Sequence, residues 1–140
     1  MAYEIHINPI DLDTDLAVGI LLNTSHENGK LFKQSYTSLE QSSTNLLNLL
    51  LTNEGERMMQ PEFGCSLNKL LFDNISSDLV NKLDNKIRTK INYWMPYLDI
   101  VRLDILIRPD EHFVHFDLEF ALQGNKFDTG TITFKLDLQA

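Results

Sequence analysis

The first strong signal along the chain is a leucine pattern with helical spacing between residues 38 and 52. Thr37 and Glu40 fit a capping box, in which a hydroxyl and a carboxylate accept hydrogen bonds from backbone N–H groups of the first helical turn. Gly55 follows the pattern and is available for a left-handed C-cap. We therefore predict a helix over residues 38–52. Its apolar face consists of Leu39, Leu46, Leu47, Leu50 and Leu51.

A second helical pattern covers residues 77–95. Ser76 or Ser77 provides an N-cap, and Asp78 places an acid at the positive end of the helix dipole. Pro96 cannot continue a helix, because it lacks the N–H group and clashes with the preceding turn. The apolar face of this helix consists of Leu79, Val80, Leu83, Ile87, Ile91 and Trp94.

After Pro96 the hydrophobic period changes to two, which is typical of strands with one buried face. Three alternating runs are separated by turns at Pro109–Glu111 and Gly124–Asn125. The apolar members are Val101, Leu103, Ile105 and Ile107, then Val114, Phe116, Leu118, Phe120 and Leu122, then Ile132, Phe134, Leu136 and Leu138. The predicted fold class is α+β, with two main helices packed on a C-terminal three-stranded antiparallel β-meander.

The remaining residues are predicted to be mostly irregular. Residues 1–36 form an irregular N-terminal hairpin segment, in which Asn28-Gly29 is the dipeptide typical of a tight turn. Residues 56–66 contain Pro61 and Gly64 and no hydrophobic period, so they form a loop, followed by a short helical turn at Leu67–Phe72. We expect one domain over residues 1–140, with a helical part at 37–95 and the meander at 97–138.

Composition narrows the classes of function. The chain has 140 residues and a net charge of −8, which argues against nucleic acid or an anionic membrane as partner, because both require clustered Lys and Arg. Cys65 is the single cysteine, so no internal disulfide forms. The N-terminus shows no signal-peptide pattern, and we expect a soluble intracellular product.

Candidate chemistry is sparse. The histidines, His6, His26, His112 and His115, lack the spacing of a zinc site, and we expect no metal and no cofactor. Cys65 is expected to be a small, buried, inert thiol. Glu56 and Glu62 flank one loop, but a glycosidase needs two carboxylates at a fixed separation, and nothing in the sequence fixes theirs. We therefore name no catalytic residue.

The loop region carries a specific motif. A leucine-rich helix ends in Thr52 and is followed by Gly55-Glu56-Arg57 and then by Pro61-Glu62-Phe63-Gly64, with a Leu71-Phe72 pair further on. This pattern resembles the wedge proteins of contractile phage tail baseplates. The resemblance covers residues 18–138, including the second capped helix and the closing meander.

The resemblance implies a structural virion protein of the inner baseplate, present in six copies around the tail tube, that initiates assembly of the contractile sheath. Its partners would be other baseplate wedge proteins, the tail sheath protein, and tail tube or hub proteins. Two alternatives remain: a subunit of a type VI secretion baseplate, and a small muralytic hydrolase, since the family has also been labelled lysozyme-like.

Two surfaces are candidate partner sites. The first is the loop, whose candidate partner-binding residues are Gly55, Glu56, Arg57, Pro61, Glu62, Phe63 and Gly64. For Arg57, contact with neighbouring subunits and an intramolecular bridge to Glu62 or Glu54 are equally good interpretations. The second surface is the edge of the last strand, where an extended sheath arm could add as a further strand. Its candidate residues are Thr131, Thr133, Lys135 and Asp137.

Overall fold

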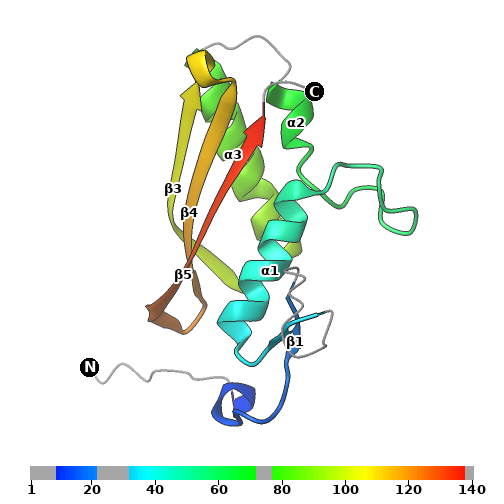
Figure 1. Cartoon of the computed structure of the whole chain (residues 1–140), viewed down its shortest axis with the longest axis vertical. Helices are drawn as coiled ribbons and strands as arrows, with labels where there is room; N and C mark the ends of the chain where they lie inside the picture. Colours follow the sequence, from blue (N-terminus) through cyan, green and yellow to red (C-terminus); the bar gives the residue numbers. More distant parts are fainter. Residues whose placement is uncertain (1–8, 22–31, 72–76, 138–140) are drawn as a thin grey trace.

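The computed structural model describes residues 9–21, 32–71 and 77–137 and consists of a helical layer packed on a twisted antiparallel sheet (Figure 1). The elements, in chain order, are η1 Pro9–Leu12, β1 Gly19–Ile20, β2 Gln34–Ser35, α1 Ser38–Leu51, α2 Leu67–Leu71, α3 Ser77–Trp94, β3 Leu98–Arg108, η3 Pro109–Glu111, β4 Phe113–Leu122 and β5 Asn125–Asp137. Among the described helices, none has the length and apolar character needed to span a bilayer. The predicted α+β class is confirmed.

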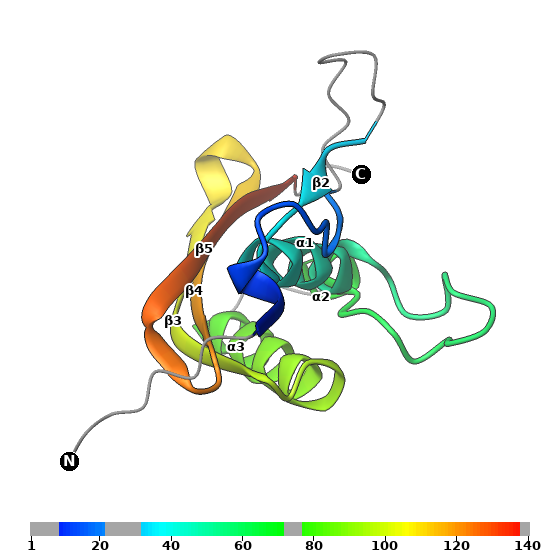
Figure 2. The same ribbon diagram turned by 90° about the horizontal axis from the view of Figure 1, so that it is seen from below.

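The main sheet has the strand order β3-β4-β5, and the two long helices lie on one face of it (Figure 2). Helix α1 contacts β5, and α3 contacts β3. Alternate residues of the central strand β4 are fully buried between the layers, as expected for a sheet with one covered face. The core includes Leu46, Leu49 and Leu50 from α1, Leu79, Leu83, Ile87 and Ile91 from α3, and Val114, Phe116, Leu118 and Phe120 from β4.

The start of α1 confirms the predicted cap and adds a partner from far away in the sequence. The hydroxyl of Thr37 accepts a hydrogen bond from the N–H of Glu40 at 3.2 Å. The Glu40 carboxylate accepts from the N–H of Tyr36, one residue before the cap, at 3.3 Å. In addition, Asp11 Oδ1 accepts from both the N–H and the hydroxyl of Ser38, at 2.7 and 2.8 Å. This carboxylate therefore ties η1 to the first turn of α1.

The end of α1 differs from the prediction. The C-cap is Thr52, which has an extended backbone conformation, and its N–H and hydroxyl both donate to the carbonyl of Asn48. Gly55 does have a positive φ of 92°, but it lies in the loop beyond the helix. A left-handed C-cap at Gly55 was therefore wrong, because the Thr52 side chain satisfies the terminal carbonyl instead.

The meander is confirmed, with two corrections. A register shift between Ile100 and Arg102 inserts Val101 as an extra residue in β3 and leaves it 56% exposed, so Val101 does not belong to the buried face. Strand β5 begins at Asn125, earlier than the alternating pattern indicated. Gly130 is required there, because an added Cβ would lie 2.6 Å from the ring of Phe120.

The N-terminal hairpin is formed by β1 and β2, which pair antiparallel with Gly19 opposite Ser35. Ser35 is buried and donates its hydroxyl proton to the Gln41 side chain of α1 at 2.6 Å, which fastens the hairpin to the helical layer. The predicted Asn28-Gly29 turn lies outside the described residues, as do His6 and His26.

Candidate functional site

The loop between α1 and α2, residues 53–66, projects away from both layers of the fold (Figures 1 and 2). Its two arms are joined by backbone hydrogen bonds: the N–H of Gly55 donates to the carbonyl of Pro61 at 2.8 Å, and the N–H of Cys65 donates to that of Thr52 at 3.1 Å. At the base, the N–H of Glu54 donates to the hydroxyl of buried Ser66 at 2.7 Å. The 53–66 loop is therefore an ordered projection held by its own hydrogen bonds.

The two glycines of the loop have different roles. Both have positive φ, 92° at Gly55 and 109° at Gly64, a backbone conformation that residues other than glycine rarely adopt. At Gly64 an added Cβ would also lie 2.4 Å from the carbonyl oxygen of Thr52, whereas Gly55 faces open space. Gly55 supplies a turn, and Gly64 lets the returning arm pass against the end of α1.

Helix α3 holds both arms of the loop through one lysine. Lys90 Nζ lies 2.6 Å from Glu54 Oε1 and also donates to the carbonyl of Glu62 at 2.9 Å. Lys86 adds a longer ion pair with Glu54 at 3.8 Å. The hydrogen bond from Lys90 is the main cause that lowers the pKa of Glu54 below its ordinary value, aided by the positive charge of Lys86.

The Glu56 carboxylate is used inside the loop. It accepts from the backbone N–H of Asn53 at 3.0 Å and from the Asn53 side chain at 2.7 Å. These bonds, the backbone one first, lower the pKa of Glu56. The ionised carboxylate therefore closes the first turn of the 53–66 loop. This contact with Asn53 was not predicted from the sequence.

Arg57 packs on Phe63, and Phe63 packs on α3. The guanidinium carbon of Arg57 lies 3.7 Å from the centroid of the Phe63 ring, which is a cation–π contact. Phe63 in turn meets Trp94 edge-on at 5.2 Å. Phe63 is partly buried and packs against the hydrophobic core, so it fixes the loop to the body of the fold. In the part of the chain that the structure describes, Arg57 forms no ion pair with Glu54 or Glu62.

Two residues at the tip of the loop were not among the candidates predicted from the sequence. Met58 and Met59 are 97% and 94% exposed. They occupy the two central positions of a turn closed by the N–H of Gln60 donating to the carbonyl of Arg57 at 3.2 Å. The central positions of turns are usually Gly, Pro, Asn, Asp or Ser. A pair of methionines in a loop was therefore an unusual feature that could have indicated a functional surface.

The second candidate surface is β5, which is an edge strand of the main sheet. Its outward side chains, Thr131, Thr133, Lys135 and Asp137, are all exposed. On this outward face of the sheet they contact side chains of β4: Thr133 donates to Asp117 at 2.7 Å, and Lys135 Nζ lies 5.0 Å from the centroid of the Phe113 ring. Within residues 9–21, 32–71 and 77–137, only β4 pairs with β5, so its other edge has no strand partner.

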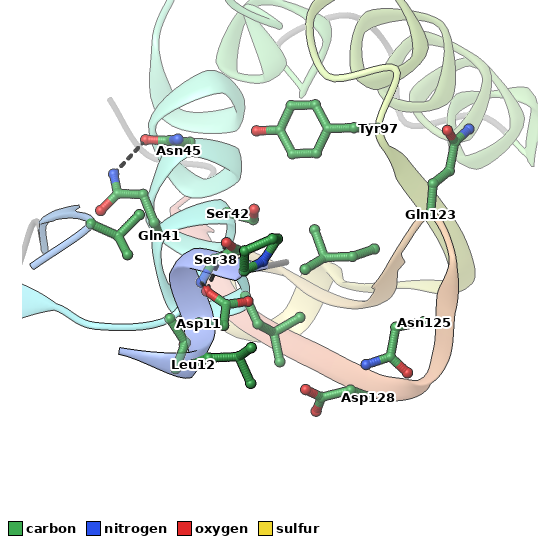
Figure 3. Close-up of a pocket in the computed structure, with 15 residues that line it drawn as sticks. Asp11, Leu12, Ser38, Gln41, Ser42, Asn45, Tyr97, Gln123, Asn125 and Asp128 are labelled. Atoms are coloured by element: carbon green, nitrogen blue, oxygen red, sulfur yellow. Dashed lines mark hydrogen bonds between the residues drawn. The ribbon is translucent and has the colours of Figure 1, made fainter. Parts of the chain in front are cut away.

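A pocket of about 1010 Å³ lies between the N-terminal half of α1, η1 and the hairpin that joins β4 to β5 (Figure 3). Its lining is rich in hydroxyl and amide groups, with Tyr97 directed toward α1. Two carboxylates reach it, Asp11 and Asp128, and Asp11 already accepts two hydrogen bonds from Ser38. Glu56 and Glu62 belong to the 53–66 loop and do not line this pocket.

The cysteine and the two described histidines, which are the candidates for a nucleophile and for metal ligands, lie among residues that give them no reactive partner in the described structure. Cys65 is fully buried, as predicted, and burial raises the pKa of its thiol to about 12. His115 lies on β4, with Nε2 3.3 Å from Asp117, whereas His112 lies in the preceding turn with a φ of 54° and not on a strand. The described residues contain no group of three or more metal-ligating side chains.

The sequence profile of this chain is that of a baseplate wedge protein. The chain belongs to the family of baseplate wedge protein gp25, whose profile matches residues 16–126. It is 24% identical to baseplate wedge protein gp25 of Enterobacteria phage T4 over 98 residues, which is 70% of this chain and 74% of that protein.

Two solved structures share the fold. One is a putative tail lysozyme from Geobacter sulfurreducens, with a TM-score of 0.63 and 20% identity over 72% of this chain and 91% of that one. The other is a chain of the anti-feeding prophage baseplate, with a TM-score of 0.56 and 16% identity over 86% of this chain and 84% of that one. The expectation of a baseplate wedge protein is confirmed by the family match reported above.

Proposed function

We propose that this chain is a structural wedge subunit of the contractile tail baseplate that starts sheath assembly by offering the free edge of β5 to an extended arm of the sheath protein. The observation that carries this proposal is the outer edge of β5, Asn125–Asp137, which pairs with no strand among the residues that the structure describes. An added strand would be held by backbone hydrogen bonds, and the spacing of side chains along the strand would set its register.

The 53–66 loop supplies the second contact, with neighbouring wedge subunits. Arg57 is the charged group best placed for it, because its donors have no hydrogen-bond or ion-pair partner within the described residues and its guanidinium is held on Phe63. The carboxylate of Glu56 is committed to Asn53 and acts by shaping the loop. Six copies around the tail tube, close to hub and tube proteins, follow from the family role, as does assembly into the virion within the host cytoplasm.

A structural role is better supported than a muralytic one. A glycosidase general acid must hold its proton near neutral pH, which requires a raised pKa. Glu56 has a lowered pKa and is exposed, which is the opposite of what a general acid needs. A cell-wall lysis assay comparing the wild type with Glu56→Gln tests this point, and lysis that is lost on substitution would support the hydrolase instead.

Hydrogen exchange, measured by mass spectrometry, tests strand addition. Amide exchange of peptides from β5 is compared between the isolated protein and purified particles with full-length sheath. Successive N–H groups of a strand point to opposite edges, so about every second amide of β5 lies on its free edge. These amides should exchange more slowly in particles, because an added strand would accept their hydrogen bonds. Peptides from β4, which has strand partners on both sides, are the internal control.

Unchanged exchange in β5, in particles that contain the protein, would contradict the sheath contact. The protein composition of the purified particle also separates a phage tail from a type VI secretion baseplate, because the two assemblies contain different sets of other proteins.

A further inference from the structure

Two methionines at the end of an ordered projection are an unusual surface. Met58 and Met59 expose 97% and 94% of their area, whereas Met95 exposes 5%. Placing large apolar side chains in water at a turn centre conflicts with local preference, and such conflicts are concentrated at functional positions. The exposure of this pair therefore calls for a partner surface that covers it.

The loop backbone holds the pair ready for binding. The turn is closed by Gln60 donating to Arg57, and the arms below it are joined by Gly55 and Pro61. Lys90 fixes the returning arm through the carbonyl of Glu62. Binding through the tip therefore orders little additional backbone, and the entropy cost falls mainly on the two side chains.

The chemistry of the tip indicates what it fits. Methionine is unbranched and polarisable, so a pair of them fills an irregular apolar groove well. Beside the pair, Arg57 carries guanidinium donors without a hydrogen-bond or ion-pair partner in the described structure, and these match a carboxylate. A lipid surface fits less well, because the chain carries a net charge of −8 and two side chains are a weak membrane attachment.

We propose that Met58 and Met59 insert into an apolar groove of a neighbouring baseplate protein, and that a carboxylate at the rim of this groove receives Arg57. This inference rests on the proposed function and names the chemistry of the partner at the loop.

Peroxide footprinting tests the proposal without changing the sequence. Hydrogen peroxide converts exposed methionine to the sulfoxide, which mass spectrometry locates. In the isolated protein, Met58 and Met59 should oxidise quickly and buried Met95 slowly. In purified particles, oxidation of Met58 and Met59 should slow at least about tenfold, because a groove that covers them excludes the oxidant.

The outcomes distinguish this inference from the proposed function. If the chain is present in the particles and its tip methionines oxidise at the rate of the isolated protein, the inserted tip is wrong and the wedge role stands. If the chain is absent from the particles, both are wrong. Protection by anionic lipid vesicles and not by particles would also overturn the groove and favour a membrane.

Matched variants give a second measurement. Met58→Ser combined with Met59→Ser removes the apolar tip, and Met58→Leu combined with Met59→Leu keeps it. Both side chains are exposed, so neither double variant should shift Tm. Burying a methionine side chain is equivalent to about tenfold or more in affinity. The serine variant should therefore be incorporated into particles at least about tenfold less than the leucine variant, and equal incorporation would contradict the proposal.

Discussion

Lys90 and Glu54 form the contact that joins the 53–66 loop to the helical layer, with Nζ 2.6 Å from Oε1. The same ammonium group donates to the carbonyl of Glu62 on the returning arm of the loop. One side chain of α3 thus holds the outgoing and the returning arm at once. The position of the loop relative to the sheet therefore depends on a residue outside the family motif.

Replacing Lys90 by methionine should loosen the loop and leave the fold intact. The substitution keeps most of the apolar stem and removes an ion pair and a hydrogen bond, so the free energy of unfolding should fall by only about 1 kcal/mol. Amide exchange of residues 55–63 should rise clearly. Lys82→Met, at an exposed position of the same helix, is the control and should change neither quantity. Unchanged loop exchange in Lys90→Met would contradict the role of this contact.

The same contact predicts a pH dependence. The folded pKa of Glu54 is lowered, so its ionised form contributes stability above the ordinary value of 4.5, and this contribution is lost as the pH falls through the lower folded pKa. Thermal melts of the wild type and of Glu54→Gln should therefore differ at neutral pH and converge in acid. In a Lys90→Met background the difference at neutral pH should shrink. A difference that does not vary with pH would rule out this linkage.

The aromatic contact at the base of the loop can be followed through the single tryptophan. Phe63 meets Trp94 at 5.2 Å, and the buried indole Nε1 has no hydrogen-bond partner among the described residues. Phe63→Ala should admit water to this nitrogen and shift the emission of Trp94 to the red, with a loss of about 1–2 kcal/mol, since Phe63 is only half-buried. Phe63→Leu keeps more of the apolar contact and should shift the emission less. An emission spectrum of Phe63→Ala identical to that of the wild type would show that Phe63 does not shield Trp94 from water.

The helices and the meander could be predicted because periodicity and end signals agree. The predicted helices at 38–52 and 77–95 correspond to Ser38–Leu51 and Ser77–Trp94, with Thr37 and Pro96 as the decisive boundary residues. The first half of β5 was missed because residues 125–130 do not alternate. There the strand depends on close packing of Gly130 against Phe120, which no local pattern encodes.

The loop was found from its motif, but its internal contacts were not. The sequence offered Arg57 with Glu54 or Glu62 as the intramolecular ion pair, whereas the structure pairs Glu54 with lysines of α3 and stacks Arg57 on Phe63. Charge signs alone do not select among several nearby partners, because the choice depends on how α3 packs beside the loop. Asp11 at the start of α1 is a similar case, since it reaches Ser38 only through the fold.

The two loop glycines provide a matched pair for the last prediction. Gly55→Ala places a side chain at a φ of 92° in open space, so only backbone strain opposes it, at about 1–2 kcal/mol. Gly64→Ala introduces similar backbone strain and, in addition, a Cβ that would lie 2.4 Å from the Thr52 carbonyl oxygen. It should therefore lower the free energy of unfolding by about 3 kcal/mol or more. Urea denaturation of the two variants measures the difference. Equal losses would mean that the returning arm does not pass against the end of α1 in solution.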